Sequence, residues 1–234
     1  MTRLQTVTPA NAGAQGQTLG AGALDSRLRG NDDVRVAALT PREEEAQLRL
    51  DFAAFAQRCF RELNPLGAFA MNWHVEVMAA KLTAVSQGRT RRLIVNVPPR
   101  HLKSLMGSVA FPAWCLGRAP GKQILCVSYA QDLADTLARD CRRIILSDWY
   151  QRAFPTRLSP QRQAVPEFET TAQGCRLATS VGGVLTGRGA DLIIIDDPLK
   201  PEEALSDAHR ESANEWFDHT LYSRSTTSSR VRSL

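Results

Sequence analysis

The five cysteines of this 234-residue chain include no Cys-x-x-Cys pair, so neither a zinc site nor a disulfide framework is indicated. Most fall inside apolar patterns, and we expect reduced core residues at Cys59, Cys115, Cys126, Cys141 and Cys175. The N-terminus lacks the apolar stretch of a signal peptide, and no run approaches the roughly 18 apolar residues of a membrane helix. We therefore expect a soluble, cytoplasmic protein with no membrane partner.

Lysine is also scarce, because only four of the 29 cationic residues are lysine and the rest are arginine. The net charge of +5 and the pI of about 9.2 permit a nucleic-acid partner without proving one. The arginine bias is equally consistent with coding composition. The hydrophobic content of 43% is enough for the core of one medium α/β domain with extensions.

Residues 1–36 contain no aromatic side chain and five glycines, which predicts a disordered, low-complexity tail. A helical segment is expected over residues 37–90. Its first helix begins at the capping-box sequence Thr40-Pro41-Arg42-Glu43, and apolar residues from Leu48 to Cys59 then share one helical face. A second helix is predicted from Asn72 to Gly88.

Residues 91–104 predict a strand, a loop and a helix. Leu93–Val97 is rich in β-branched residues, and Lys103-Ser104 is followed by apolar residues at helical spacing. A loop that feeds a helix N-terminus directs free N–H groups at an anion, and a Lys-Ser pair adds an ammonium group and a hydroxyl ligand for Mg²⁺. However, Val97 and Leu102 stand where the P-loop pattern has glycines. Alone, the run fits a buried strand and an ordinary helix start equally well.

A second run supplies the acidic half of such a site. Leu192–Ile195 is a fully apolar stretch that ends in Asp196-Asp197, which predicts a buried strand with carboxylates at its C-terminal tip. This is the Walker B arrangement. The Lys-Ser pair and the Asp pair at the ends of parallel strands are what Mg²⁺-nucleotide chemistry requires.

The remaining segments complete a predicted α/β fold, a P-loop NTPase-like parallel sheet flanked by helices, with its ATPase core over residues 91–224. In chain order we expect a strand at Gln123–Ser128, a helix at Asp132–Leu146, irregular proline-rich chain at 150–170, a strand at Arg176–Val181, a glycine-rich loop at Gly182–Gly189, a helix from Ser206 to about Leu221, and an unstructured end over 225–234.

Residues from about 44 to 224 resemble the N-terminal ATPase part of a phage or prophage terminase large subunit. The resemblance is carried by the order and spacing of several motifs: Asn72-Trp73-His74, Arg92–His101 ahead of Lys103-Ser104, Ser128-Tyr129 with Leu133-Ala134, Gly182-Gly183 through Thr186–Asp191, and Ile193–Pro198. It implies an ATPase motor that hydrolyses ATP to translocate viral double-stranded DNA into procapsids.

The resemblance also implies roles for single residues. Lys103 would neutralise the β- and γ-phosphates of ATP, Ser104 and Asp196 would hold Mg²⁺, and Asp197 would orient the attacking water, with Glu202 or Glu203 as alternatives. Arg100 would stabilise transition-state charge, and Arg142 or Arg143, which also fit a solvated helix face, are weaker candidates for a neighbouring subunit. The nucleotide loop would comprise Pro99, Arg100, His101, Leu102, Lys103 and Ser104. Trp73 is either a surface aromatic beside a helix cap, as its own context favours, or a stacking platform for adenine.

The implied partners are the terminase small subunit, the portal protein and other copies of the chain in a ring, in the host bacterial cytoplasm. The family also carries a nuclease domain, which we expect to be absent here, so the chain would be a truncated form. The alternative is an inactive prophage remnant with at most weak nucleotide or DNA binding, which Leu102 favours. A helicase-like ATPase lacks its Asp-Glu signature at Asp196-Asp197, and no kinase loop is found.

Overall fold

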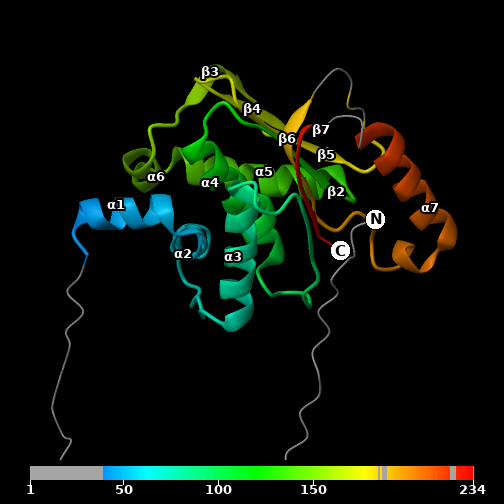
Figure 1. The fold of residues 1–234 in the computed structure, drawn as a ribbon, viewed down its shortest axis with the longest axis horizontal. Coiled ribbons are helices and arrows are strands. Elements are labelled where there is room, and N and C mark those ends of the chain that lie inside the picture. Colours follow the sequence, from blue (N-terminus) through cyan, green and yellow to red (C-terminus); the bar gives the residue numbers. More distant parts are fainter. Residues whose placement is uncertain (1–38, 184, 186–188, 222–224, 234) are drawn as a thin grey trace, which may run out of the picture. The chain divides into compact units, whose positions relative to one another are not determined.

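A computed structural model of the protein describes residues 39–183, 185, 189–221 and 225–233 (Figure 1). In this part, seven strands form one sheet in the order β1-β7-β6-β2-β5-β4-β3. They are β1 (Arg92–Val95), β2 (Gln123–Ser128), β3 (Leu158–Gln163), β4 (Glu167–Thr170), β5 (Cys175–Ser180), β6 (Ala190–Ile195) and β7 (Ser225–Ser233). Strands β1, β7, β6, β2 and β5 run parallel, whereas β4 and β3 pair antiparallel. The fold is therefore mixed α/β, and the predicted tail at 1–36 lies outside the described residues.

Helices cover both faces of the sheet. They are α1 (Pro41–Leu50), α2 (Phe52–Leu63), α3 (Trp73–Ser86), the π-helix η1 (Leu105–Ala110), α4 (Phe111–Arg118), α5 (Gln131–Leu146), α6 (Asp148–Ala153), the 3₁₀ turn η2 (Glu203–Leu205), α7 (Asp207–Trp216) and the π-helix η3 (Phe217–Leu221). The larger core joins α1 to α6 and η1 to one face, and a smaller core joins the end of α7 and η3 to the other.

The central strands are buried on both sides. In β2, Ile124 and Cys126 belong to the larger core, whereas Leu125 and Val127 belong to the smaller one, and β6 alternates in the same way. This explains why both strands read as continuous apolar runs in the sequence. The five cysteines are all free and buried, as predicted.

The first predicted helix is divided in two by Asp51. This residue ends α1 and is also the N-cap of α2, where its carboxylate accepts a hydrogen bond of 2.8 Å from the N–H of Ala53. The break lets α2 bury Phe52 and Phe55, which are at most 1% exposed, in the larger core. The apolar spacing across residues 48–59 was correct, but it could not reveal a cap inside the run.

We predict that Asp51→Ala lowers the free energy of unfolding by about 1 kcal/mol, because it removes the side-chain acceptor at the start of α2. Chemical denaturation followed by circular dichroism would measure the change. Asp51→Asn keeps an acceptor oxygen at the same position and should stay close to the wild type. Equal losses in the two variants would mean that the cap is not the stabilising feature.

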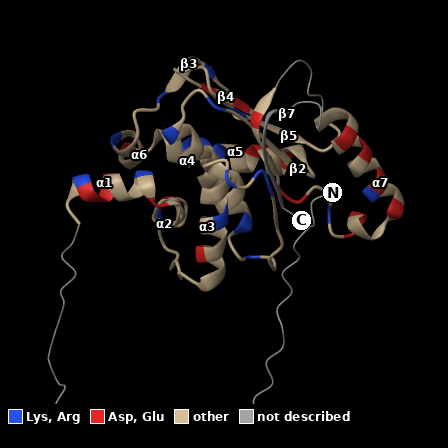
Figure 2. Ribbon diagram, viewed as in Figure 1, with Lys and Arg blue, Asp and Glu red and all other residues tan. Residues whose placement is uncertain are grey.

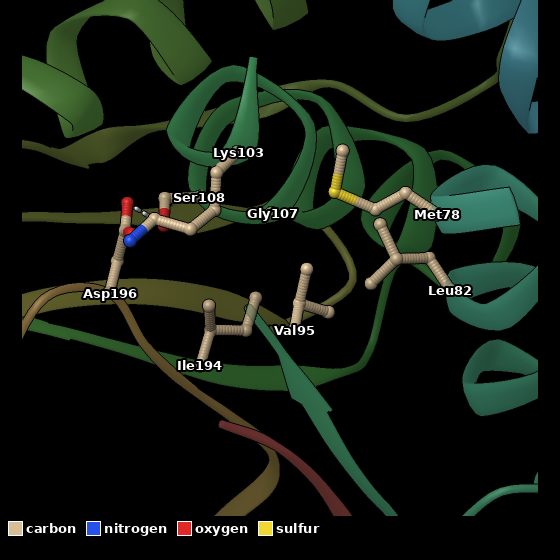
Figure 3. Close-up of a pocket in the computed structure, with 8 residues that line it drawn as sticks. All are labelled: Met78, Leu82, Val95, Lys103, Gly107, Ser108, Ile194 and Asp196. Carbon is tan, nitrogen blue, oxygen red and sulfur yellow. Dashed lines mark hydrogen bonds and ion pairs between the residues drawn. The ribbon is translucent and has the colours of Figure 1, made fainter. Parts of the chain in front are cut away.

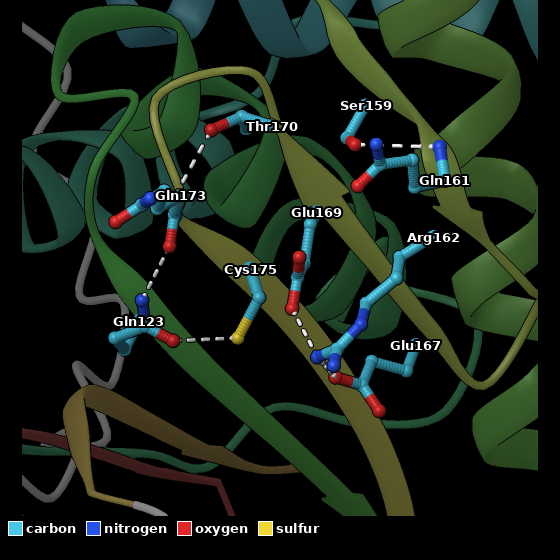
Figure 4. Close-up of polar contacts among 10 residues, drawn as sticks. Gln123, Ser159, Gln161, Arg162, Glu167, Glu169, Thr170, Gln173 and Cys175 are labelled. Atoms are coloured by element: carbon cyan, nitrogen blue, oxygen red, sulfur yellow. Dashed lines mark hydrogen bonds and ion pairs between the residues drawn. The ribbon is translucent and has the colours of Figure 1, made fainter.

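The segment predicted to be irregular, residues 150–170, instead forms α6 and the hairpin β3–β4. Arg162 joins the two strands through Glu169 at 2.6 Å and Glu167 at 3.8 Å (Figure 4). In the adjoining strands, the Cys175 thiol donates to the side-chain carbonyl of Gln123 at 2.8 Å. The prolines misled the prediction because β3 is an edge strand, where a missing backbone N–H is tolerated.

The C-terminal end is a second correction. Residues 225–234 were expected to be unstructured, but Ser225–Ser233 forms β7, which lies between β1 and β6. Its backbone pairs in parallel with both neighbours, for example at Val231 with Leu93 and Ile194. The segment has little apolar periodicity, so its strand conformation comes from tertiary pairing rather than from local propensity.

Charge and apolar length give two further observations. Acidic residues dominate α7, where Asp207, Glu211 and Glu215 recur along one short helix (Figure 2). Within the described ranges, no helix combines the length and the apolar character that crossing a membrane would need.

Candidate functional site: a lysine between two aspartates

The loop between β1 and η1 is held in an unusual backbone conformation. Arg100 and Leu102 have φ angles of 66° and 62°, in the left-handed region that favours glycine. The Nδ1 atom of His101 lies 2.9 Å from the carbonyl oxygen of Pro99 and 3.1 Å from that of Pro98. Both partners are acceptors, so Nδ1 carries the proton and His101 fixes the turn of the loop.

The acidic residues are fixed by the ends of β6 and β2. The backbone N–H of Asp196 donates to Val127 at 2.8 Å, and the N–H of Tyr129 donates to the carbonyl of Asp197 at 2.9 Å. Asp197 has a φ of 47°, which turns the chain sharply after the strand. Strands β1 and β6 are both parallel to β7, which lies between them. The loop after β1 and the Asp196-Asp197 segment after β6 therefore leave the sheet on the same side, at the C-terminal ends of the strands.

Lys103 brings the two predicted halves of the site together. Its ammonium group donates to the carboxylate of Asp197 and lies 3.7 Å from Oδ1 of Asp196. The side chains of Lys103 and Asp196 are 14% and 3% exposed, whereas that of Asp197 is 43% exposed. One cation thus faces a buried carboxylate and an accessible one.

Ser108 also belongs to this site, although the sequence analysis did not select it. Its hydroxyl donates a 2.9 Å hydrogen bond to Oδ2 of Asp196, and the residue is 1% exposed. A signal was present, because Ser108 follows Ser104 at a spacing of four residues and so lies on the same helical side. It was overlooked because it lies inside an apolar helix that reads as core.

These side chains line a pocket together with apolar residues from α3, β1 and β6 (Figure 3). The full lining consists of Met78, Leu82, Val95, Lys103, Gly107, Ser108, Ile194 and Asp196. Figure 3 shows Lys103 and Asp196 directed at one another on the polar side of this pocket. The apolar side lowers the local dielectric and therefore strengthens the interactions of the charged groups.

An aromatic group lies beside the loop. The ring centroids of His74 and His101 are 5.1 Å apart, and those of Trp73 and His74 are 6.1 Å apart. Asn72 caps α3 through the N–H of Trp73, and Trp73 is 71% exposed, which agrees with a surface aromatic beside a helix cap. The structure therefore places an accessible indole next to the loop, and adenine stacking stays a prediction.

The other candidates are arranged as follows. Arg100 is exposed on the loop, and Ser104 makes no helix-capping hydrogen bond. Arg142 donates to the side chain of Gln163 at 3.1 Å, and Arg143 donates to the carbonyl of Glu62 at 3.0 Å. Glu203 lies 3.9 Å from the ammonium group of Lys200. Their proposed catalytic roles, and that of Ser104 as a Mg²⁺ ligand, stay predictions.

Leu102, which stands where the P-loop pattern has a glycine, has a strained backbone. A non-glycine residue at a φ of 62° costs roughly 1–2 kcal/mol relative to the right-handed region. The side chain is half-buried and packs against the larger core. This packing offsets the strain, but it also holds a bulky group immediately before Lys103.

We predict that Leu102→Gly increases the affinity for MgATP by about tenfold, equivalent to about 1.4 kcal/mol, because it frees the loop N–H groups to approach a phosphate. Isothermal titration calorimetry would measure the change. Leu102→Ala is the matched control, since it removes the crowding side chain but keeps a Cβ at positive φ. An affinity of the glycine variant no higher than that of the wild type would show that Leu102 does not limit binding.

The fold and the site define a mixed α/β protein that carries a lysine between two aspartates at the C-terminal ends of its parallel strands. No family model matches the chain, and no curated protein matches it. Among solved structures, the chain is similar to the crystal structure of the HK97 bacteriophage large terminase, at 12% sequence identity and a TM-score of 0.45. The match covers 76% of this chain and 37% of that one, so it spans little more than a third of that protein.

Proposed function

We propose that this chain binds Mg²⁺-nucleotide at the loop before Lys103 and hydrolyses ATP, as a P-loop-type ATPase. The observation that carries the proposal is the contact of Lys103 with Asp196 and Asp197 at the C-terminal ends of the parallel strands. A lysine ammonium group, a helix N-terminus and two carboxylates are the groups that phosphoryl transfer uses. They come from segments 93 residues apart in sequence and meet only in the folded chain.

The donor set fits a magnesium ion that arrives with a nucleotide. Mg²⁺ usually takes one or two protein carboxylates and fills its other positions with phosphate and water. Among the described residues, no three His, Cys, Asp or Glu side chains gather into a closed metal cage. In this proposal Asp196 would hold the ion together with a serine hydroxyl, from Ser104 or Ser108, and the ion would supply charge neutralisation at the phosphates.

The ion pair between Lys103 and Asp197 is a resting state in this proposal. A bound phosphate competes for the ammonium group of Lys103, which then releases the more exposed carboxylate, Asp197. The freed carboxylate can accept a hydrogen bond from the attacking water and orient it. Arg100, exposed on the same loop, would stabilise negative charge that develops on the transferred phosphoryl group.

At the level of cellular role, we propose that the chain corresponds to the ATPase part of a phage terminase large subunit. Its partner would then be double-stranded DNA, which is consistent with the net charge of +5, and it would work with a small subunit, a portal protein and further copies of itself. The order of the sequence motifs supports this assignment.

A second candidate is a folded protein that binds nucleotide weakly and does not turn it over. Leu102 at positive φ and the closed pair of Lys103 with Asp197 favour it, since both oppose entry of a phosphate. The two candidates differ in turnover, not in fold.

The test is a titration of MgATP into the purified full chain, followed by a phosphate-release assay with and without linear duplex DNA. Binding, turnover and stimulation by DNA are expected for the motor. Binding without turnover would support the second candidate. If circular dichroism shows a folded chain that neither binds nor hydrolyses MgATP, the ATPase proposal is wrong, and hydrolysis that DNA does not change would contradict the motor role.

A further inference from the structure

Arg176, in β5, is a fully buried charge with few partners. The residue is 0% exposed, and its Nε and Nη1 atoms have no hydrogen-bond partner among the described residues. Burying a guanidinium group is costly, and a buried charge replaced by an apolar side chain of similar volume often leaves stability unchanged or higher. The desolvation cost of the guanidinium group therefore argues against a purely stabilising role for this arginine.

The hydrogen bond that Arg176 makes points toward the site. Its Nη2 atom donates to the carbonyl oxygen of Ser108 at 3.1 Å, and the hydroxyl of the same Ser108 donates to Asp196 at 2.9 Å. Asp196 in turn lies 3.7 Å from the ammonium group of Lys103. A continuous series of contacts thus connects a buried guanidinium group to the proposed catalytic residues.

The segment that Arg176 contacts is not a regular α-helix. Ser108 lies in the π-helix η1, where the backbone hydrogen-bond pattern is wider than in an α-helix, and such turns are rare and often occur at functional sites. The choice of turn decides which side chain points at the sheet edge. A donor that binds the carbonyl of Ser108 restrains the backbone turn that carries its hydroxyl.

The surroundings of Cys126 support the proximity of the two charges. Burial raises the pKa of this thiol, the positive charge of Arg176 lowers it, and the negative charge of Asp196 raises it. Both charged groups therefore act on one side chain of β2, between β5 and β6. The guanidinium and the carboxylate share one buried environment on the larger-core face.

We propose that Arg176 is a positioning residue that holds the π-turn through the carbonyl of Ser108, so that the Ser108 hydroxyl keeps the Asp196 carboxylate oriented for Mg²⁺-nucleotide. The proposal rests on the ATPase function proposed above. It assigns the arginine no contact with the nucleotide, and its effect passes entirely through Ser108.

The test compares Arg176→Met, Arg176→Lys and Ser108→Ala in the full chain. For Arg176→Met we expect kcat to fall about tenfold or more while KM changes by less than about threefold, because an aligned carboxylate matters most in the transition state. The melting temperature should be unchanged or higher. Arg176→Lys keeps a donor for the Ser108 carbonyl and should restore part of the turnover.

The double variant Arg176→Met with Ser108→Ala gives the sharpest result. If Arg176 acts only through Ser108, the double variant should be no slower than Ser108→Ala alone, whereas independent roles would give additive losses. Additive losses, or a wild-type kcat in Arg176→Met, would overturn the proposal. So would a large fall in melting temperature with no selective loss of turnover, which would assign Arg176 a purely structural role.

Hydrogen exchange can test whether Arg176 holds the turn independently of whether the chain is an ATPase. Arg176→Met should accelerate amide exchange in a peptide that spans Leu105–Ala110, and Ser108→Ala should not. If the wild type proves to lack ATPase activity while this difference is seen, the function proposal fails but the hold of Arg176 on the turn stands. If exchange over Leu105–Ala110 is the same in Arg176→Met and the wild type, Arg176 does not hold the turn.

Discussion

Replacing Asp196 with asparagine is expected to lower the kcat for ATP hydrolysis by at least about 100-fold, because this carboxylate is the buried negative charge of the site. The side chain of Asp196 is 3% exposed, accepts a hydrogen bond from Ser108 and faces Lys103. Asparagine has nearly the same shape but no charge, so it can neither neutralise Mg²⁺ nor balance the lysine. A phosphate-release assay at saturating MgATP would measure the effect.

Asp207→Asn is the matched control for this variant. Asp207 begins α7, is exposed and pairs with Arg210, so the same chemical change there should leave kcat unaltered. Circular dichroism should show that both variants are folded. An Asp196→Asn protein with more than about a tenth of the wild-type kcat would remove Asp196 from the mechanism.

Replacing Lys103 with alanine should weaken MgATP binding by at least about 100-fold, equivalent to about 2.7 kcal/mol. The variant loses the ammonium group that would contact the phosphates. It also leaves two carboxylates, Asp196 and Asp197, without the cation that now faces both of them, so they repel an incoming anion. Isothermal titration calorimetry would measure the loss of affinity.

Two controls define what the lysine contributes. Lys81→Ala removes an exposed lysine from α3 and should leave affinity unchanged. Lys103→Arg keeps the charge but replaces a compact ammonium group with a planar guanidinium, and we expect intermediate affinity. Wild-type binding in Lys103→Ala would show that nucleotide, if bound, occupies another site.

The separation between a binding defect and a catalytic defect is the useful feature of this pair of variants. Lys103 is expected to act on the nucleotide already in the ground state, whereas Asp196 acts mainly where charge develops during transfer. If both variants lost only turnover, Lys103 would belong to catalysis alone, and the resting pair with Asp197 would not oppose binding.

Strands β2 and β6 of the parallel part were predictable because their signals are local. The apolar runs of β2 and β6 are long and unbroken, and the predicted strand at Gln123–Ser128 matches the observed one. The capped start of α1 at Thr40 was likewise readable, since the capping box is a short-range pattern. These elements need no knowledge of what packs against them.

The misread segments have the opposite character. The segments that form β3 and β7 carry weak or contrary local signals, because the first contains proline and the second is Ser/Thr-rich. Each segment forms a strand by pairing with a neighbouring strand. Hydrogen bonds to an adjacent strand satisfy the backbone whatever the side chains prefer. Sequence periodicity could not report a partner that lies far away along the chain.

For the site, the sequence by itself determined which side chains stand at two places: a Lys-Ser pair at a helix start and an Asp pair at a strand end. Only the tertiary structure decided that Lys103 faces both aspartates, that Ser108 reaches Asp196, and that a buried Arg176 contacts Ser108. The physical reason is that residue type and local spacing set which groups a segment can offer. The register of parallel strands and the π-turn set which of those groups come within hydrogen-bonding distance.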